Sequence, residues 1–183
     1  MIYSFSLQQV ALVVGAFYFI ANLFAALRPV DAAVWLRALP RSVPAGLVLM
    51  GVAVVWSLWL CVNIDLGEFT PMRTWLILIC LALGGAMLVY SREYLAVRAI
   101  AVLLLLAANI VLDAAFLRDE PAKLVLVVLA YVWIVAGIVF LFSPYLLRDL
   151  IGWWTKTPRC SRIGGIAGAV FGLVLMVLGF VAY

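Results

Sequence analysis

Six long apolar runs, separated by short segments that hold most of the charged residues, dominate the sequence. They cover Leu7–Leu27, Pro44–Asn63, Pro71–Tyr90, Tyr94–Leu117, Pro121–Ser143 and Ile163–Tyr183. A helix needs about 20 predominantly apolar residues to cross the hydrocarbon core of a bilayer, and each run is at least that long. The pattern predicts an all-α integral membrane protein with six transmembrane helices in a compact bundle. We expect residues 1–183 to form a single polytopic membrane domain.

Two shorter segments mix charged, aromatic and apolar residues. Asp31–Leu39 contains Trp35 and Arg37, and Tyr145–Trp154 contains arginine, aspartate and two tryptophans. Such a mixture suits a short helix that lies at the lipid headgroups, where tryptophan is enriched. We therefore predict two interfacial helices, on the side of the membrane that carries the basic loops.

Composition supports lipid as the main solvent of the chain. Hydrophobic residues make up 69% of the 183 positions and charged residues 11%, whereas soluble domains are about half apolar and a quarter charged. The net charge of +4 is small, and the charged residues are distributed by side of the predicted bundle. It does not form the basic patch of a nucleic-acid-binding protein, so we expect the lipid bilayer, and no nucleic acid, as a partner.

The basic residues divide unequally between the two sides of the predicted bundle. Three lie on one side: Arg73, Arg118 and Lys123. Nine lie on the other: Arg28, Arg37, Arg41, Arg92, Arg98, Arg148, Lys156, Arg159 and Arg162. Since lysine and arginine accumulate in cytoplasmic loops, we expect a multi-pass protein of the inner (cytoplasmic) membrane with its basic loops in the cytoplasm and both termini outside.

The fourth run alone carries ionisable side chains well inside an apolar segment. At a helical period, Arg98, Asn109 and Asp113 fall within a stripe of roughly 60°, which should face protein rather than lipid. One interpretation makes Asp113 a proton or cation site with Asn109 as its hydrogen-bonding companion. In the other, which we favour, Arg98 extends to the headgroups while Asp113 reaches water and bonds Asn109. Arg98 and Asp113 are separated by roughly 22 Å of helix and cannot pair directly.

Small residues line one face of the sixth run and one face of the first. Gly164, Gly168 and Gly172 form a GxxxGxxxG pattern, and Gly179 returns to nearly the same face. The first run carries a comparable small and polar face, formed by Ala11, Gly15, Asn22 and Ala26. Such faces let helix backbones approach closely. We expect the glycine face to pack against another helix of this chain. The alternative is that it packs against a partner subunit or a second copy. We expect Gly168→Leu to disrupt folding or assembly and Leu175→Ala to be mild.

The sequence offers no set of catalytic or cofactor-binding residues. It contains no histidine, which removes the commonest ligand for haem, copper and zinc and the usual general base. Its cysteines, Cys61, Cys80 and Cys160, are far apart and match no metal-ligand spacing. We therefore expect neither an enzyme, nor a metal site, nor a cofactor.

Two functions are consistent with these features. We favour a non-catalytic structural or accessory subunit of a membrane protein complex, which packs through small-residue helix faces against a membrane-protein partner or a second copy. The alternative is a small proton- or cation-coupled transporter or channel that uses Asp113 and Asn109. A weak similarity between Trp35–Ser42 and Trp153–Cys160 suggests either duplicated halves, as in transporters, or, as we favour, a basic and tryptophan-rich interface selected twice.

Overall fold

The computed structural model describes residues 5–90, 94–116, 118 and 120–182, and these residues form helices without β-strands. Six helices are long and apolar enough to cross a membrane, which confirms the six predicted apolar helices. They are α1 (Leu7–Leu27), α3 (Val43–Asn63), α4 (Arg73–Tyr90), α5 (Leu95–Ala115), α6 (Lys123–Phe142) and α8 (Pro158–Val181). Leu117 and Tyr183, the expected ends of the fourth and sixth runs, and Arg92 lie outside the described residues.

Local capping explains where α1 and α8 begin. Ser6 and Gln9 form a reciprocal capping box at the start of α1. The helix α8 starts at Pro158, five residues before the predicted Ile163, because the Thr157 hydroxyl accepts a hydrogen bond from the Cys160 N–H (3.3 Å) and proline suits the first helical position. The basic segment expected to be a loop up to Arg162 is therefore mostly the first turn of this helix. A 3₁₀ segment, η2 (Gly67–Met72), precedes α4.

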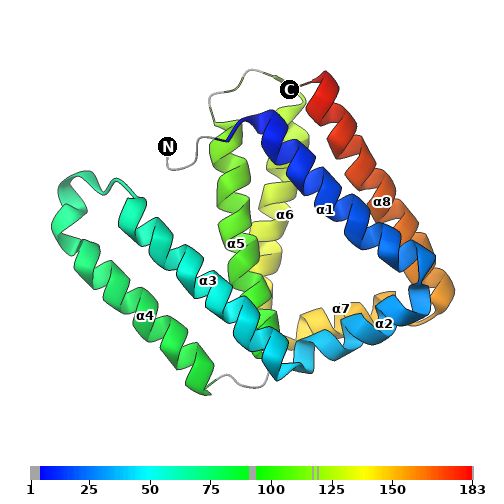
Figure 1. The fold of residues 1–183 in the computed structure, drawn as a ribbon, viewed down its shortest axis with the longest axis horizontal. Coiled ribbons are helices and arrows are strands. Elements are labelled where there is room, and N and C mark those ends of the chain that lie inside the picture. Colours follow the sequence, from blue (N-terminus) through cyan, green and yellow to red (C-terminus); the bar gives the residue numbers. More distant parts are fainter. Residues whose placement is uncertain (1–4, 91–93, 117, 119, 183) are drawn as a thin grey trace.

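Two short helices occupy the positions expected from the sequence. They are α2 (Pro29–Ala38), which continues into the 3₁₀ turn η1 (Leu39–Arg41), and α7 (Tyr145–Trp154). These elements contact each other and lie across one end of the molecule, which we call the base (Figure 1). Eight of the nine basic residues assigned to one side lie on these elements or on the helix ends beside them; the ninth is Arg92. Which side of a membrane the base faces stays a prediction.

The long helices form three antiparallel pairs rather than the compact bundle that we expected (Figure 1). The α1–α8 and α5–α6 pairs lean together at the end opposite the base, and α2 and α7 connect them across the base. The third pair, α3–α4, joins the rest through contact of α3 with α5, while α4 packs mainly on α3. The expectation of a compact bundle was wrong because apolar composition alone does not draw helices together in lipid.

The core is correspondingly divided. The larger cluster joins α1, α5, α6 and α8, and contains Val10, Ala108, Val111, Leu126 and Leu175 among others. A smaller cluster, Met50 with Leu95 and Ala99, joins α3 to α5. Leu175, for which we expected truncation to alanine to be mild, is 0% exposed. Truncation of a fully buried leucine costs about 2–5 kcal/mol.

Candidate functional site

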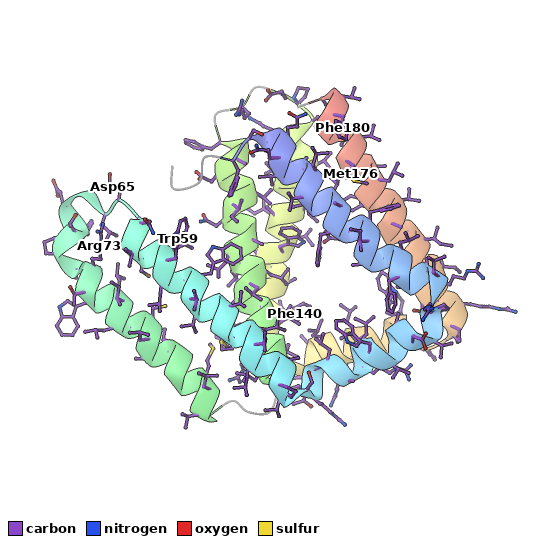
Figure 2. The ribbon with its side chains drawn as sticks, viewed as in Figure 1. Trp59, Asp65, Arg73, Phe140, Met176 and Phe180 are labelled. Atoms are coloured by element: carbon purple, nitrogen blue, oxygen red, sulfur yellow. The ribbon has the colours of Figure 1, made fainter. Side chains whose placement is uncertain are left out.

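A close contact between α1 and α8 brings the two predicted small-residue faces together. A methyl group built on Gly172 of α8 comes within 2.5 Å of the Phe19 nitrogen and 2.7 Å of the Gly15 carbonyl oxygen. A methyl group on Gly15 comes within 2.8 Å of the Gly172 carbonyl oxygen and of Met176 Cγ, and Met176 lies between the two helices in Figure 2. Ala11, in the same face, is 0% exposed. The α1–α8 contact is therefore a contact of backbones.

The other predicted packing residues lie along the same side of α8. A methyl group on Gly168 would collide with the Asn22 side chain, and one on Gly164 with the indole of Trp154 in α7. Gly179 faces Leu12 at 3.2 Å. Gly165, which the sequence analysis did not single out, also touches α1, because a methyl group there comes within 2.7 Å of the Ala26 nitrogen.

The polar stripe of α5 is only partly enclosed by protein. Arg98 and Asp113 are half-buried, whereas Asn109, between them, is exposed. Asn22 and Asn63 each donate a side-chain hydrogen bond to the carbonyl four residues earlier (2.8 and 2.7 Å). Asn109 forms no hydrogen bond with any described residue, so the expected bond to Asp113 is not made. No helix of this chain therefore covers Asn109, and the expectation that the stripe faces protein stays a prediction there.

An aromatic cluster at the middle of the spans was missed by the sequence analysis. Trp133 Nε1 of α6 donates a hydrogen bond to the Tyr18 hydroxyl of α1 (2.9 Å), and the two rings are stacked with centroids 6.3 Å apart. Phe171 of α8 packs edge-on against Tyr18 at 5.6 Å. The available signal was position, since tyrosine and tryptophan normally gather at membrane interfaces and here lie mid-helix. Beside this cluster, an apolar cleft of about 450 Å³ separates α6 from Phe171.

At the base, a side-chain link joins the two short helices. Arg37 of α2 donates from Nε to the Thr155 hydroxyl (2.8 Å) and from Nη2 to the Thr155 carbonyl oxygen (2.5 Å), at the end of α7. Thr155 is 4% exposed, and its hydroxyl donates in turn to the Ile151 carbonyl oxygen (2.7 Å). Arg37 and Thr155 occupy equivalent positions in the two similar segments of the sequence, which was the only signal for this contact.

Beside this link is an open cleft of about 420 Å³, which we call the base cleft. Its lining residues are Arg37, Pro40, Arg41, Arg148, Asp149, Ile151 and Gly152. Arg148 pairs with Asp149 (2.8 Å) and its Nη1 donates to the Tyr94 hydroxyl (3.3 Å). The hydrogen bond to Asp149 and its negative charge raise the pKa of Arg148 above its ordinary value, and Tyr94 adds a smaller contribution in the same direction. The guanidinium of Arg148 therefore stays charged.

The cysteines and acids do not form a metal site within the described residues. No group of three or more cysteine, aspartate or glutamate side chains there is arranged to hold an ion. Cys61 and Cys80 are half-buried neighbours across the α3–α4 contact, and Cys160 is exposed. The base cleft is therefore the candidate site with the most convergent polar groups.

Comparison with protein-family models, with curated proteins and with solved structures found no match to this chain. The geometry of the helices and of the base cleft therefore carries the functional argument.

Proposed function

We propose that this protein is a non-catalytic structural subunit of a membrane protein complex, and that a partner helix packs between α5 and the α3–α4 pair. The observation that carries the proposal is the exposed Asn109 amide. It lies about 9 Å of helix, six residues, from the end of α5 at Ala115, inside an otherwise apolar span. A polar side chain at such a depth is costly in lipid and characteristically bonds across to another helix.

The direction of Asn109 fits this arrangement. At a helical period, Asn109 lies about 40° from Leu95, on the face of α5 that packs against Met50 of α3 near the base. Away from the base, α3 diverges from α5 (Figure 1). Asn109 is consequently left exposed on the side where α3 would have covered it, and a helix from a partner fits there.

The α3–α4 pair supplies the second surface for such a partner. Only 6% of the α4 span is buried within the chain, compared with 39% of the α5 span. Gly51 of α3 and Gly85 of α4 are exposed, and a methyl group built on either meets nothing within 4 Å. Small residues are typical of contacts between membrane helices. The open glycines are thus positions where another backbone can approach.

The tip of the α3–α4 pair is ordered by its own hydrogen bonds. Arg73 donates to the Ile64 carbonyl oxygen (2.8 Å), and the Asp65 carboxylate accepts from the Gly67 N–H (3.1 Å). Figure 2 shows Asp65 and Arg73 together at this end. Because the connection is already formed, the pair offers a largely preorganised surface, which lowers the entropy lost on binding.

A transport function has weaker support. It requires Asp113 and Asn109 to line a path enclosed by protein, and Asn109 is exposed in the single chain. Such a path would exist only within an oligomer. Both the structural role and a transport role therefore require this chain to assemble with a partner or a second copy.

The test combines photo-crosslinking in native membranes with variants on the two proposed surfaces. A crosslinker at Ser57 of α3, which lies seven residues from Met50 and therefore on the side of the helix that faces α5, should yield a discrete adduct that survives as a complex in mild detergent. Asn109→Leu and Gly85→Leu should each lower recovery of that complex at least fivefold while leaving the chain folded. Ala167→Leu, on an exposed face of α8, is the matched control and should leave recovery unchanged.

Two results would contradict the proposal. One is a chain that runs alone in every mild detergent and gives no adduct from Ser57. The other is unchanged recovery of the complex with both Asn109→Leu and Gly85→Leu. The mass of the adduct distinguishes a second copy of this 20.1 kDa chain from a different protein.

A further inference from the structure

We propose that the base cleft binds the phosphate group of an anionic membrane lipid. The cleft lies between α2–η1 and α7 at the base, where α1 and α6 end and α3, α5 and α8 begin. The assembly role proposed above uses other surfaces, so the two proposals stand independently.

Charge is the first argument for an anionic ligand. Three arginines and one aspartate line the cleft, so the net charge of the lining is +2. The single acid, Asp149, is already paired with Arg148 at 2.8 Å. Guanidinium groups bind phosphate oxygens with two parallel hydrogen bonds, which makes arginine well suited to this recognition.

The state of each arginine is the second argument. Arg37 is fixed by Thr155 and Arg148 by Asp149 and Tyr94, which leaves each of them with further N–H groups to donate. Arg41 forms no hydrogen bond or ion pair with any described residue. The cleft therefore combines two positioned cations with one whose donors are entirely available to a ligand.

Space for the ligand is the third argument. The cleft holds about 420 Å³, enough for a phosphate and the polar group attached to it. Gly152 in its lining has no side chain, and a methyl group built there meets nothing within 4 Å. The glycine keeps this wall open, so an anion can approach the backbone of α7.

The surroundings favour a lipid over a soluble phosphate compound. Trp35 and Trp153 on the two short helices are 63% and 71% exposed, and Trp154 is 40% exposed. Exposed indoles next to arginines are typical of segments at the headgroup level, where basic pockets bind anionic headgroups. A lipid phosphate there is already concentrated beside the cleft, with its acyl chains continuing along the apolar helices.

The experiment uses the full chain, purified in a neutral detergent, with native mass spectrometry and thermal unfolding. The probes are phosphatidylglycerol, phosphatidylcholine and inorganic phosphate, each added separately. We expect phosphatidylglycerol to remain bound at least fivefold more than phosphatidylcholine and to raise the unfolding temperature. Inorganic phosphate at millimolar concentration should compete weakly with the lipid.

Two arginine variants make the test specific for the cleft. Arg41→Gln should lower retention of phosphatidylglycerol at least threefold without altering the unfolding temperature of the lipid-free protein, since Arg41 has no partner to lose among the described residues. Arg118→Gln is the matched control, because Arg118 is also exposed but lies at the opposite end, between α5 and α6. It should retain the lipid as wild type does.

Three outcomes would overturn the proposal. The first is equal retention of the anionic and zwitterionic lipids. The second is an equal loss in Arg41→Gln and Arg118→Gln, which would show attraction by overall charge. The third is protection by inorganic phosphate as strong as that by the lipid, which would assign the cleft to a soluble phosphate compound.

Discussion

The α1–α8 and α3–α4 pairs are both antiparallel pairs of apolar helices, yet they pack very differently. In α1–α8, Gly15 and Gly172 bring the two backbones into contact, and Leu175 beside them is 0% exposed. In α3–α4, the single glycine contact is Gly84 against the side chain of Val54, at 2.7 Å, while Gly85 faces open space. The difference shows that the position of small residues, rather than hydrophobicity, decides which membrane helices close on each other.

The largest expected effect comes from exchanging glycine for leucine in the two pairs. Gly172→Leu must separate α1 from α8, because the new side chain meets backbone atoms of Phe19 and Gly15 that cannot rotate away. We expect a loss of about 3 kcal/mol or more, seen as low yield and a lower unfolding temperature in detergent. Gly85→Leu in the lone chain should be neutral or slightly stabilising, since leucine is the better helix former. Equal destabilisation by both variants would remove the distinction between the pairs.

The next effect concerns the hydrogen bonds between Arg37 and Thr155 at the base, which join α2 to the end of α7. Arg37→Gln removes two charge-assisted hydrogen bonds, one to the hydroxyl and one to the carbonyl oxygen of the buried Thr155. Such bonds contribute about 1.5–3 kcal/mol, and the exposure of Arg37 places the expected loss near the lower end. Chemical denaturation in mixed micelles measures it, with Arg41→Gln as the unlinked control. A variant as stable as that control would show that the link is dispensable.

A smaller effect tests whether the α1–α8 pair is energetically coupled to α6. Tyr18→Phe keeps the stacked ring but removes the acceptor of the Trp133 hydrogen bond. Hydrogen bonds between membrane helices contribute about 0.6 kcal/mol on average and rarely more than 1.7 kcal/mol. A double-mutant cycle with Trp133→Phe should give a coupling energy of about 1 kcal/mol. A coupling near zero would mean that the two residues are merely adjacent.

The fate of individual residues shows what the sequence was able to predict. Long apolar runs identify helices because every backbone group in lipid must be satisfied within its own segment. The glycines of α8 and the small face of α1 were recognised separately, but their pairing was not predictable, because lipid gives apolar surfaces no preference among neighbours. The Arg37–Thr155 and Tyr18–Trp133 contacts join residues 118 and 115 positions apart, and no local pattern records such distances. Asn109 was expected to face protein because a polar side chain is costly in lipid, but that argument does not say whether the covering helix belongs to this chain or to a partner.

The smallest expected effect concerns Asp113, which lies two residues before the end of α5, on the same face as Asn109. If Asp113 serves structure only, Asp113→Asn keeps a side chain of the same shape and removes a charge from a half-buried position. Stability should then change by less than about 0.5 kcal/mol, and recovery of the complex should stay at the wild-type level. If Asp113 carries protons or cations, the same variant should fold and assemble normally but lose its physiological effect. We expect the first result, measured by unfolding temperature, complex recovery and complementation of a deletion strain. A folded, fully assembled Asp113→Asn protein that fails to complement would favour transport over the structural role. It would place the transport function on the face of α5 that lies beside the α3–α4 pair.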